Sequence, residues 1–189
     1  MNRALSAVAA SSLLAAGCGA FYLEAEQPQV CITQNSIDVP ITSVGVSGSF
    51  ATQVSFDVGK WYPGLGDSAP AAGEVVRFLQ LRVSLPPGQQ VADLDWLTTF
   101  DVTLLPPASD LAPIVLLHYQ KPQGTAQVTS LALDSTVSNQ NLAAYVRQGT
   151  LNFEFAGSGQ GQLPPADWTV DVGGCFYASV HKTLSDILH

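Results

Sequence analysis

The stretch Leu79-Gln80-Leu81-Arg82-Val83-Ser84-Leu85 alternates apolar and polar side chains without interruption. Because successive side chains of a β-strand point to opposite faces of a sheet, this period of two predicts a strand with one face in a core and one in water. Four further segments alternate in the same way: Val54 to Val58, Thr99 to Leu104, Leu151 to Phe155 and Trp168 to Val172. The sequence therefore predicts an all-β protein.

Turn-forming residues separate these segments at short intervals. They are Pro63 to Gly66, Pro86 to Gly88, Pro106-Pro107, Pro122 to Gly124, Gly157 to Gly161 and Pro164-Pro165. The glycine-rich run Gly157 to Gly161 is interpreted as a hairpin loop, because no Lys-Ser/Thr pair or helix follows it to bind phosphate. Strands at this spacing predict an antiparallel two-sheet β-sandwich. We place an immunoglobulin-like sandwich first and a jelly roll or flattened barrel second.

Two segments depart from simple alternation. Ile114 to Tyr119 is apolar on both faces as far as His118, which predicts a central strand covered on both sides. One short helix is predicted near 140–147: Asn139 can cap it, apolar side chains recur at helical spacing within it, and Gly149 lies just past its end. We expect this helix to close one end of the sandwich.

The charge of the chain argues against nucleic acid as a partner. The 189 residues carry a formal net charge of −8. The cations after residue 18 are far apart in sequence: Lys60, Arg77, Arg82, Lys121, Arg147 and Lys182. Binding to phosphate requires clustered Lys and Arg, so neither nucleic acid nor an electrostatic membrane surface is expected.

An apolar segment precedes a cysteine near the start of the chain. Arg3 supplies a positive charge, Ala4 to Ala16 are uncharged, and the segment ends in Leu14-Ala15-Ala16-Gly17-Cys18. This arrangement resembles the signal peptide and lipobox of bacterial lipoproteins, although Ala15 stands where that class usually has Leu. The resemblance implies cleavage before Cys18 by signal peptidase II and a diacylglycerol on the Cys18 thiol. The alternative is an ordinary secretory signal that is cut elsewhere.

The resemblance also sets the expected organisation: a signal peptide at 1–17, a short lipidated tether at 18–29 and one β-sandwich domain at 30–189. A lipidated Cys18 would be the membrane attachment, because no apolar stretch of 18 or more residues follows it. Several acyl chains each contribute about 0.8 kcal/mol per buried CH₂, enough to hold a domain at a membrane. Gly19 follows the cysteine where an Asp would retain an enteric lipoprotein on the inner membrane, so the resemblance favours the outer membrane.

Two cysteines remain, Cys31 and Cys175, in an exported setting where oxidation is permitted. We predict that they form a disulfide between the first and last strands. Closing a loop of about 145 residues would destabilise the unfolded chain by at most roughly 5 kcal/mol. Two separate buried thiols are the alternative.

Residues suited to chemistry are few and dispersed. His118, His181 and His189 have no motif around them, and Asp93, Asp95 and Asp101 lack the glycine and the final Glu of a calcium loop. We therefore predict no catalytic residue, no metal site and no cofactor. Trp61 and Tyr62 precede Pro63-Gly64 in a loop and form a candidate ligand or partner surface, or else an anchor that covers the sandwich edge.

These observations favour a noncatalytic, lipid-anchored protein of the cell envelope whose sandwich presents loops to a protein partner. A solute-binding or carbohydrate-binding lipoprotein is the alternative, and a hydrolase is the third hypothesis. The three differ in geometry: a concave pocket with convergent polar groups would favour a ligand, a buried carboxylate beside His118 an enzyme, and a filled core a protein partner.

Overall fold

The computed structural model describes residues 22–60, 74–88, 93–124, 128–164 and 168–183, with the backbone alone for 22–28 and 180–183. Most of these residues belong to strands. The strands are β1 (Tyr22–Asp38), β2 (Ile41–Val44), β3 (Ser47–Asp57), β4 (Val75–Ser84), β5 (Leu97–Leu105), β6 (Ile114–Gln120), β7 (Ser130–Asp134), β8 (Thr150–Gln160) and β9 (Thr169–Thr183).

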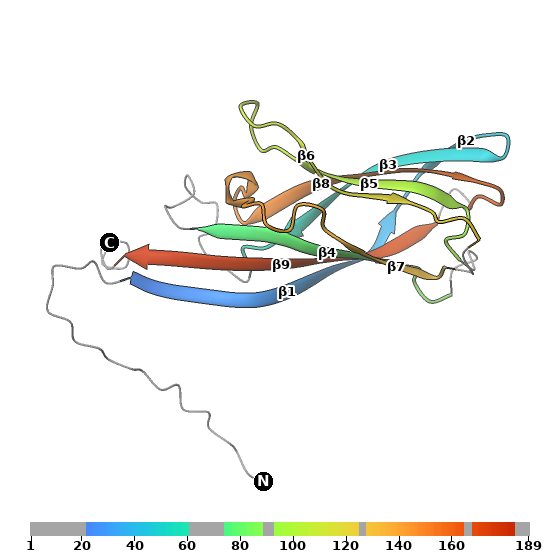
Figure 1. Cartoon of the computed structure of the whole chain (residues 1–189). Helices are drawn as coiled ribbons and strands as arrows, with labels where there is room; N and C mark the ends of the chain where they lie inside the picture. The colour runs from blue at the N-terminus through green and yellow to red at the C-terminus, as the bar shows by residue number, and fades with distance from the viewer. Residues whose placement is uncertain (1–21, 61–73, 89–92, 125–127, 165–167, 184–189) are drawn as a thin grey trace, which may run out of the picture.

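The strands form two antiparallel sheets, layered one over the other (Figure 1). One sheet has the order β1-β9-β4-β7, and the other has the order β2-β3-β8-β5-β6. The prediction of an all-β, two-sheet antiparallel sandwich is confirmed. Alternation along β3 places every second residue in the core, as its burial pattern shows.

The strand order is that of the jelly roll, which we placed second. The pairs β1·β9, β3·β8, β4·β7 and β5·β6 are nested in the sequence and alternate between the two sheets, as in a long hairpin rolled on itself. An immunoglobulin-like sandwich, our first choice, would put the first and last strands in different sheets. Here β1 and β9 are neighbours in one sheet.

Aromatic rings join the two sheets in the middle of the sandwich. Phe153 of β8 lies with its ring centroid 5.3 Å from Phe56, 5.7 Å from Phe78 and 6.2 Å from Phe176. All four rings are buried, and Phe78 and Phe176 come from the opposite sheet. Such ring pairs contribute about 0.5–1.5 kcal/mol each beyond the burial of their area.

The predicted helix near 140–147 is wrong. This segment has only a 3-10 turn, η1 (Ala143–Tyr145). Asn141 accepts the N–H of Val76 with its side chain, and the N–H of Leu142 donates to the Val76 carbonyl over 2.7 Å. The backbone is therefore engaged with β4 where the helix would begin, and the apolar side chains pack from a turn instead.

The prediction of a central strand at Ile114 to Tyr119 is also wrong, since β6 is an edge strand. Strand β6 has a β-bulge. Val102 of β5 pairs with Leu117 and the next residue, Thr103, pairs with Val115, so Leu116 has no register partner in β5. The bulge changes the phase of the alternation, so Leu116 and Leu117 are both buried although they are consecutive. The consecutive apolar residues of Ile114 to Tyr119 therefore result from this bulge and not from burial of the strand on two faces.

The run Gly157 to Gly161 is not a hairpin loop, because its first four residues are the end of β8. A Cβ at Gly157 would lie 2.7 Å from the Phe50 ring, and one at Gly159 would lie 2.2 Å from Trp96 Cε3. The glycines therefore make room for aromatic rings against the strand.

The sandwich has two ends that matter for the site. β1 begins at Tyr22, opposite Thr183 of β9, at what we call the near end. The turn between β2 and β3 lies at the opposite or far end, where Ser47 pairs with Gln160 (Figure 1). Because β1 starts at residue 22, it includes eight residues of the segment that we expected to be tether.

Candidate functional site

Three residues singled out from the sequence, Cys18, Trp61 and Tyr62, lie outside the described residues, and their roles stay predictions. Strand β3 ends at Asp57 and strand β4 begins at Val75, both at the near end. His189 also lies outside the described residues, and only the backbone of His181 is described.

Cys31 and Cys175 form a disulfide. They are register partners in β1 and β9, with Cα atoms 4.0 Å apart. Cys31 is exposed on the outer face of its sheet, whereas Cys175 is 1% exposed. The Nε2 of Gln29 donates to Cys31 Sγ over 3.6 Å. The bridge therefore joins the first strand to the last, and one of its sulfurs belongs to an exposed residue.

His118 pairs with Asp101 across β5 and β6, with Nδ1 2.5 Å from Oδ1. The two side chains are 58% and 43% exposed. Because both are open to solvent, their attraction is screened, and such a pair contributes about 0–1 kcal/mol. The pair lines neither of the two hollows described below, so it has the features of a surface contact.

Asp93 and Asp95 organise a loop at the far end. Asp93 Oδ1 accepts the N–H of Asp95 over 3.0 Å, and Asp95 Oδ1 accepts the N–H of Val128 over 3.0 Å. Lys121 Nζ donates to the Asp95 carbonyl oxygen over 2.5 Å. Burial, assisted by the charge of Asp95, raises the pKa of Tyr119 above 10.0. Within the described residues, no three His, Cys, Asp or Glu lie close enough to hold a metal ion.

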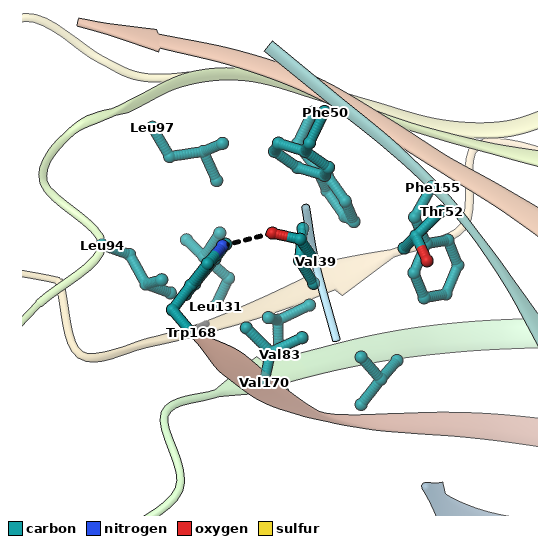
Figure 2. Close-up of a pocket in the computed structure, with 12 residues that line it drawn as sticks. Val39, Phe50, Thr52, Val83, Leu94, Leu97, Leu131, Phe155, Trp168 and Val170 are labelled. Atoms are coloured by element: carbon teal, nitrogen blue, oxygen red, sulfur yellow. Dashed lines mark hydrogen bonds between the residues drawn. The ribbon is translucent and has the colours of Figure 1, made fainter. Parts of the chain in front are cut away.

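A small hollow lies between the two sheets (Figure 2). Its volume is about 20 Å³, close to the space of one water molecule, and its lining is apolar. The hydroxyl of Thr52, which is part of the lining, donates to the Asp38 carbonyl over 3.3 Å. Trp168 Nε1 donates to the Val39 carbonyl over 2.6 Å beside it (Figure 2). In this conformation the interior is packed and too small for a solute.

A larger hollow lies on the surface at the far end, and we call it the tip groove. Its volume is about 300 Å³, and it lies between the β2–β3 turn and the residues that follow β8. The lining residues are Ile41, Ser43, Gly45, Val46, Gly161, Leu163 and Pro164. None of them carries a charge, although the chain as a whole is acidic.

Two apolar side chains project beside the tip groove. Val44 is 81% exposed and Val46 is 71% exposed. They flank Gly45, whose φ of +64° suits the first position of a type II′ hairpin turn. The N–H of Gly161 donates to the Val46 carbonyl over 2.9 Å, which ties the turn to the end of β8. The turn therefore presents two apolar side chains to water.

Sequence reasoning missed this surface. The available signal was Val-Gly-Val at a turn, where polar residues usually stand. Val44 and Val46 each expose well over half of their surface. Apolar side chains exposed in this way are typical of protein contact surfaces, because binding a partner removes their apolar area from water. The tip groove is therefore the candidate functional site of the described residues.

Comparison with protein families and with characterised proteins found no match to this sequence. Solved structures with some backbone similarity include Desmodium yellow mottle tymovirus, with a TM-score of 0.45 and 14% identity over 92% of this chain and 95% of that one. Another is turnip yellow mosaic virus, with a TM-score of 0.38 and 11% identity over 95% and 91%. These scores are too low to carry any conclusion here. No helix in the described part of the chain is long and apolar enough to cross a membrane.

Proposed function

We propose that this chain is a noncatalytic lipoprotein of the cell envelope, anchored through Cys18, that contacts another envelope protein through the tip groove. The anchor rests on the residues Leu14 to Cys18 and their resemblance to a lipobox. With Gly19 after the cysteine, the outer membrane is the proposed location. The signal peptide at 1–17 would be absent from the mature protein.

The observation that carries the partner role is the exposure of Val44 and Val46 at the far end. Strand β1, which leads from Cys18 into the domain, starts at the near end, and the β2–β3 turn lies at the other (Figure 1). A domain tethered at its near end holds its far end away from the membrane that anchors it. The apolar turn is then placed to meet a protein partner.

A solute or carbohydrate ligand is the second candidate function, and the same groove favours it. Its volume of about 300 Å³ is at the lower limit of ligand pockets. More of the exposed lining of the groove is polar than apolar, and Ser43 is the one lining residue with a polar side chain. Native mass spectrometry of the purified domain with small glycans and solutes would detect such a ligand, and Ser43→Ala, which removes the side-chain hydroxyl of the lining, would then weaken its binding.

Anchoring is tested by fractionation. Cys18→Ser should move the protein from the membrane fraction to the soluble fraction without unfolding it, because the acyl chains are the proposed attachment. Metabolic labelling with a fatty acid should mark the wild type alone. A Cys18→Ser protein that stays with membranes would contradict the anchor.

Partner contact is tested by photocrosslinking in intact cells. A photoreactive residue at position 46 should capture a defined envelope protein, and Val44→Asp should abolish the capture. Position 115 offers a matched control, because Val115 is 54% exposed but lies on β6, away from the tip. Equal capture from positions 46 and 115 would refute the groove as the contact surface.

A further inference from the structure

Strand β1 is held in its sheet through a long ladder to a single neighbouring strand. It lies at the edge of its sheet and has β9 as its sheet neighbour. Two β-bulges interrupt its ladder, between Gln27 and Val30 and between Gln34 and Ile37. Each bulge interrupts the regular backbone ladder between β1 and β9.

Among the described side chains of β1, from Gln29 to Asp38, none is fully buried. Ile32 and Ile37 are half-buried and pack against the core, whereas Val170, Val172 and Phe176 of β9 are buried within it. Three hydrogen bonds add to this attachment: Gln34 Nε2 donates to the Ser55 carbonyl over 2.9 Å, the Ser36 N–H donates to Asp171 over 2.9 Å, and the Thr52 hydroxyl donates to the Asp38 carbonyl over 3.3 Å. None of the four Phe residues in the middle of the sandwich belongs to β1.

The chain is held firmly at the residue that follows β1. Val39 is 3% exposed. Its carbonyl accepts Trp168 Nε1 over 2.6 Å, and its N–H donates to the Trp168 carbonyl over 3.4 Å (Figure 2). These two bonds to Trp168 fix the chain at Val39, at the far end and directly after the last residue of β1.

The disulfide lies in the uninterrupted part of the ladder between the two bulges, from Val30 to Gln34. With the disulfide intact, the residues of β1 on either side of Cys31 can separate from β9, but the whole strand cannot. Without the bridge, no covalent bond holds β1 to β9, and the interrupted ladder, the half-buried side chains and the hydrogen bonds of Gln34, Ser36 and Asp38 remain. Local opening of this kind costs less than global unfolding wherever few buried contacts are lost.

We propose that β1 is a redox-released strap: reduction of Cys31–Cys175 frees residues 22–38 from the sheet while the rest of the sandwich stays folded. The reductant would be a protein dithiol, and the exposed Cys31 is its point of attack. A thiolate of the dithiol attacks Cys31 Sγ, the disulfide bond breaks, and Cys175 leaves as a thiolate that takes up a proton. The second thiol of the reductant then displaces Cys31 from the mixed disulfide, so two electrons pass and the dithiol becomes a disulfide.

Release would change how the domain is tethered, a consequence that rests on the proposed lipid anchor. The 17 residues of β1 would become free chain that reaches at most about 60 Å. The first fixed residue would move from Tyr22 at the near end to Val39 at the far end. Oxidised protein would thus be held close to its membrane, and reduced protein would gain reach and freedom to reorient.

Hydrogen exchange with mass spectrometry tests the strap on the Cys18→Ser protein, which needs no membrane. In the reduced wild type, amides of residues 22–38 should exchange at least tenfold faster than in the oxidised form. Amides of β3, β5 and β8 should change by less than about twofold. The double variant Cys31→Ser/Cys175→Ser should match the reduced wild type in the absence of any reductant.

Two results would overturn the strap. One is unchanged exchange in residues 22–38 on reduction. The other is a parallel rise in all strands, which would make the bridge a staple of the whole fold. Failure of the lipid anchor would appear only in fractionation of the wild type, so the two proposals fail separately.

Discussion

The hydrogen bond from Trp168 to Val39 allows a clean measurement of what one buried donor contributes. Trp168→Phe removes the indole N–H and leaves the Val39 carbonyl without that donor in a site that is 3% exposed. Trp96 provides a matched control. It is 4% exposed and lies edge to face with Trp168 at 5.2 Å, and among the described residues its Nε1 has no hydrogen-bond partner.

The two substitutions remove the same atoms but different interactions. Each loses the volume of one ring, and this cost largely cancels in the comparison. Trp168→Phe also leaves a buried acceptor unsatisfied, which costs about 1–3 kcal/mol. Trp96→Phe instead removes a buried donor that pairs with nothing. We therefore expect Trp168→Phe to be less stable than Trp96→Phe by about 1–3 kcal/mol.

Urea unfolding followed by far-UV circular dichroism measures this difference without depending on tryptophan fluorescence. An equal m-value in both variants would show that the compactness of the two states is unchanged. For a domain of this size, 1 kcal/mol corresponds to roughly 2–4 °C in Tm, so a thermal melt gives an independent reading. If Trp96→Phe costs as much as Trp168→Phe or more, the bond to Val39 does not stabilise the fold as argued.

Two further outcomes follow from the described contacts. Gly159→Ala should destabilise the domain by about 1–3 kcal/mol or more, because its Cβ would lie 2.2 Å from the Trp96 ring and 2.5 Å from the Trp96 carbonyl oxygen. Gly173→Ala, with its nearest neighbour at 3.6 Å, should change urea stability by less than about 0.5 kcal/mol, and equal costs would contradict the steric argument. Burial first, and then the charge of Asp95, raise the pKa of Tyr119, so its contribution to stability is present below pH 10 and is lost as pH rises through the higher folded pKa. Tyr119→Phe should make urea stability fall less steeply from pH 9 to 11, and identical slopes would refute this.

Alternation in the sequence located most of the long strands but missed β2 and β7, and it did not give the strand order. Alternation in segments such as Leu151 to Phe155 depends only on which face each side chain takes, and this holds in any sandwich. The choice between an immunoglobulin-like arrangement and a jelly roll depends on which strands pair, and alternation is the same in both. The pairing of Cys31 with Cys175 was the one clue in the sequence, because it places the first and last strands together.

Two of the wrong predictions share a physical origin, which is contact with residues distant in the sequence. The helix near 140–147 failed because Asn141 and Leu142 bond to Val76, about 65 residues away. The loop at Gly157 to Gly161 failed because Phe50 and Trp96 need space against that strand. Local propensity describes what a segment would do alone, and tertiary contacts decided otherwise.

The nested strand order constrains where the candidate partner surface can be. In this topology the β2–β3 turn and the residues after β8 meet at the far end, while β1 starts and β9 finishes at the near end. If Cys18 carries lipid as proposed, the near end, where β3 ends and β4 begins, faces the membrane. The tip groove is at the other end of the sandwich. The proposed anchor and the proposed partner surface are therefore separated by the length of the strands, so a partner could bind the valines without displacing the domain from its membrane.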